Sequence, residues 1–126
     1  IGTAMLQKDR IRQSIGKETT FSYDRNEDEE LLRVLLSLSG EVSKRLKDKD
    51  MVGRVVTVKI RNRDFSTHTK QTMLSNPVYQ TEEIYEFASK LYMDLKDPIT
   101  PVRLIGVTVS GLEPRVYRNM TIYDFI

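Results

Sequence analysis

Two basic side chains stand two residues apart in a segment where apolar and polar residues alternate. The alternation over residues 54–61 predicts a strand. One face of this strand holds the apolar residues Val56, Val58 and Ile60. The other face holds Val55, Thr57, Lys59 and Arg61. Ammonium and guanidinium groups repeated along one face can neutralise phosphates, so the segment indicates a surface that binds a polyanion.

Residue types that support metal or covalent chemistry are scarce. The chain has 126 residues, no cysteine and one histidine, His68, so thiolate metal sites and disulfides are excluded and a histidine zinc site is disfavoured. Residues 27–30 are all acidic and stand at the expected start of a helix, where they compensate the helix dipole. Two-metal nucleotidyl transfer needs carboxylates that converge on Mg²⁺. We therefore expect no catalytic residue and no metal site in this chain.

The first half of the chain predicts a strand followed by a helix. Residues 17–23 are rich in threonine and aromatic residues and are typical of a strand. Asn26 and, three residues later, Glu29 have the spacing of a capping box at a helix N-terminus. Apolar residues then recur at spacings of three and four, as in an amphipathic helix. This stripe consists of Leu31, Val34, Leu35, Leu38, Val42 and Leu46.

The second half predicts three more elements after the strand at 54–61. A turn at 62–64 leads to a strand over about 66–74, which Asn76-Pro77 is expected to end. Thr81 is expected to cap a second helix, whose buried stripe is Ile84, Phe87, Ala88, Leu91 and Leu95. Residues 102–110 alternate again and predict the last strand.

The resulting order is β-α-β-β-α-β, the ferredoxin-like arrangement of the α+β class, with two helices on one face of a four-stranded antiparallel sheet. The helices must cover the apolar strand face, which leaves the face with Thr57, Lys59 and Arg61 open. Charge follows the same division, since residues 51–74 hold five basic residues and one acidic residue, whereas residues 75–101 hold two basic and five acidic residues. A basic sheet opposite acidic helices attracts phosphates.

The stretch from Arg12 to Phe21, RQSIGKETTF, resembles the segment that opens the little finger domain of DinB-type Y-family DNA polymerases. Residues 53–61, Asp64-Phe65 with the threonine-rich strand after it, and residues 102–112 agree with the same family in order and spacing. The resemblance covers about residues 10–112. Gln13 departs from it, because the family often has a basic residue there.

The resemblance implies a little finger domain over residues 14–112, after an interdomain linker at 1–13. Such a domain grips the sugar-phosphate backbone of primer–template DNA without sequence preference, because phosphate contacts position a protein without reading bases. Gly16 would let backbone N–H groups approach a phosphate, and Ser14 would donate a hydroxyl hydrogen bond to it. The full set of DNA-binding residues expected is Ser14, Ile15, Gly16, Thr57, Lys59, Arg61, His68, Lys70 and Arg103.

The resemblance also implies a parent protein that is an error-prone translesion DNA-directed DNA polymerase. Its palm, fingers and thumb domains would be partners of this chain. The catalytic carboxylates and Mg²⁺ would belong to that catalytic core, and no cofactor is expected in this fragment.

The last residues, 113–126, are expected to be a tail that binds the bacterial sliding clamp. Residues 119–123 resemble the clamp motif Q-L-[SD]-L-F, in which an amide anchors one end of an extended peptide and apolar groups fill a groove. The residues expected to bind the clamp are Asn119, Met120, Ile122 and Tyr123. The alternative is a tail that frays, or that folds back onto the domain through Ile122 and Phe125.

Two other classes of function share this topology. A stand-alone ferredoxin-like RNA-binding module would present aromatic residues on its open face for base stacking. A small acylphosphatase-like enzyme would need a loop that cradles phosphate together with an arginine. The sequence has no apolar run near the ~20 residues of a membrane span and no signal peptide, so we expect a cytoplasmic protein without a membrane partner.

Overall fold

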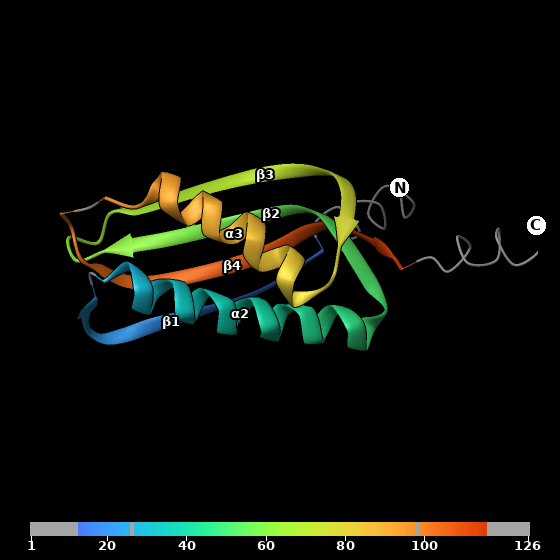
Figure 1. The fold of residues 1–126 in the computed structure, drawn as a ribbon, viewed down its shortest axis with the longest axis horizontal. Helices are drawn as coiled ribbons and strands as arrows, with labels where there is room; N and C mark the ends of the chain where they lie inside the picture. Colours follow the sequence, from blue (N-terminus) through green and yellow to red (C-terminus); the bar gives the residue numbers. More distant parts are fainter. Residues whose placement is uncertain (1–12, 26, 98, 116–126) are drawn as a thin grey trace, which may run out of the picture.

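The chain folds into four strands and two helices, in a computed structural model that describes residues 13–25, 27–97 and 99–115. The elements in order are β1 (Ser14–Arg25), α2 (Asp28–Lys49), β2 (Met51–Asn62), β3 (Thr67–Val78), α3 (Thr81–Leu95) and β4 (Val102–Pro114). The predicted β-α-β-β-α-β order is confirmed (Figure 1).

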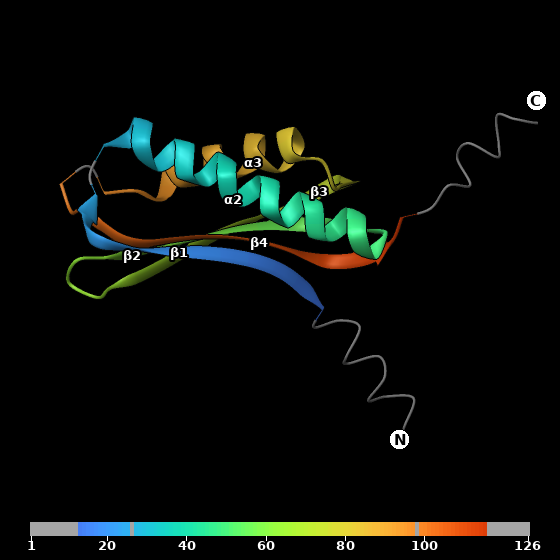
Figure 2. The ribbon, with the colours of Figure 1, turned by 90° about the horizontal axis from the view of Figure 1, so that it is seen from below.

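The strands form one antiparallel sheet in the order β1-β4-β2-β3, so β1 and β3 are its edges. Both helices lie on the same face of this sheet, as Figure 2 shows with α2 and α3 above the strands. The other face carries no helix. This confirms the predicted architecture, and it leaves one side of the sheet free of covering elements in the described part of the chain.

The core lies between the helices and the covered face of the sheet. The strand residues Val56, Val58 and Ile60 are at most 1% exposed, as their alternation predicted. Buried residues of both helices pack on them, mainly Leu31, Leu35, Leu38, Val42, Leu46, Ile84, Ala88, Leu91 and Tyr92. Removal of this apolar area from water is the main driving force for the fold.

Both helix starts differ from the predicted caps. The N-cap of α2 is Glu27, which makes no side-chain capping hydrogen bond, and Asn26 lies outside the described residues. The N-cap of α3 is Gln80 rather than Thr81, and it forms a capping box with Glu83. The prediction for α3 was wrong by one residue because Gln80 and Glu83 also have capping-box spacing.

The prediction that Asn76-Pro77 ends the third strand was also wrong, because β3 runs through Pro77 to Val78. Proline lacks the N–H that a central strand needs, but β3 is an edge strand, where this loss is tolerated. The pairing of β2 with β3 is also irregular there, since Gly53 pairs with Val78 and Val55 with Met73. A bulge in the ladder thus accommodates the proline.

A polar contact joins the start of α2 to the end of α3. Lys96 Nζ and the Tyr92 hydroxyl both donate to the Asp28 carboxylate, the latter over 3.0 Å. The hydrogen bond from Lys96 lowers the pKa of Asp28, against the opposing effect of burial. Burial, and then the Asp28 hydrogen bond, raise the pKa of Tyr92 far above its usual value.

Neither helix in the described residues combines the length and apolar character needed to cross a membrane.

Candidate nucleic-acid interface

The uncovered side of the sheet carries mainly small and polar residues, a few charges and the apolar residues Val55, Met73 and Leu104. Cross-strand pairing places on it every second residue of each strand, offset by one from the buried set. We call this surface the open face. It consists of Ser14, Gly16, Glu18, Thr20, Val55, Thr57, Lys59, Arg61, Thr67, Thr69, Gln71, Met73, Leu104, Gly106, Thr108 and Ser110.

The charged residues of the open face are Glu18, Lys59 and Arg61. Arg61 Nε donates to Thr67 Oγ1 over 3.1 Å, which holds the guanidinium along the surface. Lys59 Nζ lies 3.3 Å from Glu18 Oε1. The predicted basic character is therefore present but reduced, because one carboxylate accompanies the two cations. An exposed pair of this kind is worth about 0–1 kcal/mol, so a phosphate can compete for Lys59.

Gly106 makes the contact between Lys59 and Glu18 possible. It stands in β4 between the two residues, which both pair with it across the sheet. A Cβ at Gly106 would lie 2.9 Å from Glu18 Cβ, so no other residue fits there without movement. The neighbouring row repeats this pattern with Gly16, where a Cβ would lie 2.5 Å from Thr108 Oγ1.

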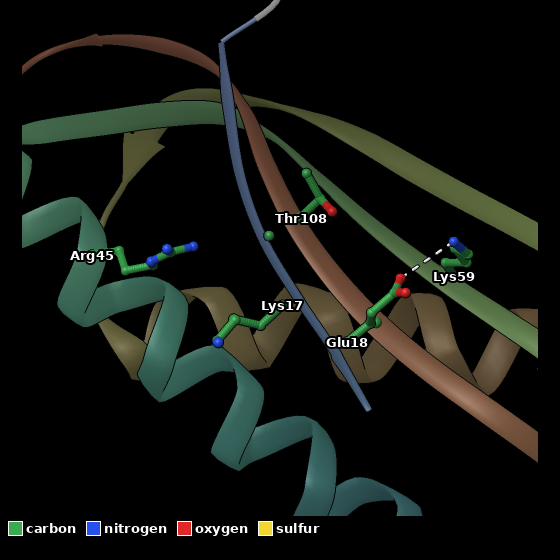
Figure 3. Close-up of a pocket in the computed structure, with 7 residues that line it drawn as sticks. Lys17, Glu18, Arg45, Lys59 and Thr108 are labelled. Atoms are coloured by element: carbon green, nitrogen blue, oxygen red, sulfur yellow. Dashed lines mark hydrogen bonds and ion pairs between the residues drawn. The ribbon is translucent and has the colours of Figure 1, made fainter. Parts of the chain in front are cut away.

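These two glycines lie in a shallow depression of about 450 Å³, lined by Gly16, Lys17, Glu18, Arg45, Lys59, Gly106 and Thr108 (Figure 3). Lys17 of β1 and Arg45 of α2 line it on the side of β1 that faces the helix α2. Lys17 Nζ lies 3.6 Å from Glu41 Oε1, and the Arg45 side chain is exposed. The depression therefore adds cations at the β1 edge that the sequence analysis did not identify.

The structure gathers five of the predicted DNA-binding residues on the open face: Ser14, Gly16, Thr57, Lys59 and Arg61. Ile15 points the other way and is 6% exposed within the core, so only its backbone is available. Residues 14–16 belong to β1 and not to a turn, so the loop that an acylphosphatase-like enzyme needs is not formed there.

His68 and Lys70 share one face of β3, as predicted, but it is the helix-covered face. They pair with Ile60 and Val58, which are core residues. Lys70 Nζ lies 3.3 Å from Asp94 Oδ2 of α3, and both groups are exposed because β3 is an edge strand. The structure therefore does not bring these two residues together with Lys59 and Arg61.

Arg103 lies near the turn between β2 and β3, where its guanidinium stands 5.9 Å from the centre of the Phe65 ring. It is thus far along the sheet from Ser14, which pairs with Ser110 near the other end of β4. The residues expected to bind the clamp, 119–123, lie outside the described part of the chain.

None of the sixteen residues named above for the open face is aromatic, which disfavours base stacking on that part of the sheet and so the RNA-binding alternative. Within residues 13–25, 27–97 and 99–115, no three His, Cys, Asp or Glu side chains are grouped so that they could hold a metal ion.

The family model of the impB/mucB/samB family C-terminal domain matches residues 12–122. The chain belongs to this family. Within the impB/mucB/samB family, DNA polymerase IV of Staphylococcus aureus strain Newman is 50% identical over 121 residues, which are 96% of this chain and 34% of that protein. DNA polymerase IV of strain MRSA252 gives the same figures. The chain thus spans about a third of the length of these relatives.

Solved structures agree with this family assignment. The little finger domain of PolIV, in complex with the beta-clamp processivity factor, aligns with a TM-score of 0.67 and 25% identity over 84% of this chain and 95% of that one. DinB from Sulfolobus solfataricus shares the fold, with a TM-score of 0.70 and 19% identity over 80% of this chain and 29% of that one. The resemblance to the little finger domain of DinB-type polymerases is confirmed.

Proposed function

We propose that this chain is the DNA-binding domain of a translesion DNA-directed DNA polymerase, and that its open face lies against the sugar-phosphate backbone of primer–template DNA. The observation that carries the proposal is the uncovered sheet face with Lys59 and Arg61 beside a depression that contains two glycines. The 50% identity to DNA polymerase IV supports it. Palm, fingers and thumb domains of the parent would supply the chemistry and the Mg²⁺ ions.

The dimensions and chemistry of the open face suit a duplex. Four strands spaced about 4.8 Å apart span roughly 14 Å, close to the major-groove width of about 12 Å. Threonine and serine hydroxyl groups flank the cations and can donate to phosphate oxygens. Only Arg61 and Gln71 of the open-face residues named above have planar groups that can make two hydrogen bonds to one base edge, and Arg61 is held by Thr67. The domain should therefore bind without sequence preference, which suits a polymerase that copies distorted templates.

A salt titration with two charge-matched variants tests this function. The double variant Lys59→Ala with Arg61→Ala should bind a labelled primer–template more weakly than the native chain. It should also reduce the slope of log affinity against log salt by about 2, roughly one per phosphate contact.

The matched control removes the same charge from the helix side, with Arg33→Ala and Lys90→Ala. Both control residues are exposed, and each forms an ion pair with a carboxylate of its own helix. Equal losses in the two double variants would mean that net charge, and not the open face, determines binding.

We also propose that residues 117–126 bind a sliding clamp as an extended segment, with Ile122 and Tyr123 as buried anchors and Asn119 and Met120 beside them. The solved complex of a beta-clamp with the little finger domain of PolIV supports this proposal. The described chain ends at Arg115, whose N–H donates to the Asp50 carbonyl over 2.8 Å. The tail thus begins at the end of the sheet away from the β2–β3 turn, where a partner need not cover the middle of the open face.

Calorimetry with the cognate clamp tests the tail. We expect an affinity in the micromolar range, about −8 kcal/mol, because a short segment must offset the entropy that association costs. Ile122→Ala with Tyr123→Ala should remove most of it, since a few central residues dominate such interfaces. Equal affinities of the native and the double-variant chain would show that this segment is not the clamp ligand.

A further inference from the structure

An aromatic residue at the tip of the β2–β3 hairpin has an unfavourable backbone conformation and an exposed ring. Phe65 has φ 67°, in the left-handed region that bulky side chains rarely adopt. Its ring is in solvent, since the residue is 70% exposed. The exposed ring does not pack in the core, so core packing does not explain the strained backbone. Backbone strain of this kind is often retained at functional positions.

The turn around Phe65 is fixed by several hydrogen bonds. The Phe65 N–H donates to the Asn62 carbonyl, and the Asn62 N–H donates to the Ser66 carbonyl, both over 2.9 Å. Asp64 Oδ1 accepts from the Ser66 N–H at 3.0 Å and from its hydroxyl at 2.6 Å. The Ser66 hydroxyl is the main cause of the lowered pKa of Asp64, because its hydrogen bond favours the ionised carboxylate. The ring is thus presented on a rigid support.

Basic residues occur at and beside this turn. The Arg103 guanidinium stands 5.9 Å from its centre, within the distance at which a cation and an aromatic face attract. Arg61 and Arg63 flank the turn in sequence, and Arg63 is fixed by its N–H, which donates to the Pro101 carbonyl over 3.0 Å. With Asp64 as the acidic member of this group, the hairpin tip has an excess of positive charge.

The hairpin tip adjoins the open face. Arg61 belongs to that face, and its Nε donates to Thr67 on the other side of the turn. Figure 2 shows the β2–β3 turn at the left end of the sheet, lowered toward the side away from the helices. A nucleic acid that lay along the open face would therefore pass beside Phe65.

We propose that Phe65 is a stacking site for an unpaired base, which it holds where the duplex on the open face gives way to single-stranded DNA. The inference rests on the proposed DNA binding and adds a second type of ligand to it. A protein ligand is less compatible with the tip, because arginines at the turn beside an exposed ring match the phosphates and π-face of a nucleotide. Duplex DNA does not use the site, since its bases are already stacked.

Phe65→Asn tests the ring without damage to the turn, because asparagine adopts the left-handed conformation more readily than phenylalanine. The ligands are a blunt duplex and the same duplex with five unpaired adenosines, at either the 5′ or the 3′ end. The variant should bind the blunt duplex within twofold of the native chain. It should lose about fivefold or more of the affinity for at least one of the extended duplexes, in line with the effect of one stacked base.

Phe65→Trp supplies an independent signal, because the chain contains no tryptophan. Its fluorescence should be quenched by the extended duplex and not by the blunt one. Leu36→Trp is the matched control, since Leu36 is 43% exposed on α2, and its fluorescence should respond to neither DNA. Quenching in Phe65→Trp with full retention of its affinity would support the stack.

Three results would decide against the inference. Native-like affinity of Phe65→Asn for both extended duplexes, or a Phe65→Trp signal that does not distinguish them from the blunt duplex, would overturn the stacking site and leave the proposed function intact. If the native chain bound neither duplex, the proposed function would fail and the stacking site with it.

Discussion

The carboxylate of Glu18 should limit how tightly the open face binds DNA, so its neutralisation should increase affinity. Glu18 is the acidic residue of that face, and its Oε1 lies 3.3 Å from Lys59 Nζ. Glu18→Gln keeps the shape of the side chain and removes its charge. The variant frees the ammonium of Lys59 for a phosphate and removes a repulsion between two anions.

The expected size of this gain follows from two contributions. In the native chain a phosphate must displace Glu18 from Lys59. This exposed ion pair is worth about 0.5 kcal/mol, a cost that Glu18→Gln removes. Repulsion between a carboxylate and a phosphate about 6 Å apart costs roughly 0.7 kcal/mol at the dielectric constant of water. Together they amount to about 1 kcal/mol, or about fivefold in affinity. The gain should shrink as salt rises, because both contributions are screened.

Fluorescence anisotropy with a labelled primer–template at low and high salt measures this gain. Glu86→Gln is the matched control, since Glu86 is exposed on α3 and pairs with Lys90 over 3.6 Å. It changes net charge by the same amount and should raise affinity much less. If Glu18→Gln left affinity unchanged or lowered it, or if Glu86→Gln matched it, DNA would not lie over the Lys59–Glu18 row.

Two further predictions concern stability. Asp28→Asn should lower the free energy of unfolding by about 1–2 kcal/mol, because Lys96 and Tyr92 lose a charged acceptor. The pKa of Asp28 is lowered in the fold, so its contribution is full above the unfolded value of about 3.9 and disappears as pH falls through the lower folded value. Denaturant unfolding against pH should therefore show a weaker loss of stability in acid for the variant than for the native chain, and parallel curves would contradict this. Gly53→Ala should cost about 1–3 kcal/mol in the same assay, because its Cβ would lie 2.2 Å from Cγ1 of the buried Val109, and a change below 0.5 kcal/mol would refute the close packing.

The sequence predicted the elements well where hydrophobic periodicity determines them. The stripe of α2 and the alternation of β2 both became the core, because only one orientation buries their apolar side. The order of the predicted helices and strands then indicated the ferredoxin-like topology, in which one face of the sheet is open. Element ends were less accurate, since Gln80 competes with Thr81 as a cap and an edge strand tolerates Pro77.

Residues whose position depends on cross-strand register were harder to predict. In the segment Thr67 to Lys70 both strand faces are polar, so alternation cannot tell which side faces the helices. The pairing of His68 with Ile60 shows that His68 lies on the helix-covered side, and this pairing can be seen only in the folded structure. Glu18 and Lys59 are likewise 41 residues apart and meet only across Gly106.

The position of DNA on the domain is most directly measured by backbone amide shifts during titration with primer–template. We expect the largest changes on residues of the open face, led by Gly16, Thr57, Lys59, Arg61 and Thr108. Amides in the middle of α3, from Tyr85 to Lys90, should change little. Largest changes on the helices, with a silent open face, would contradict the proposed function directly.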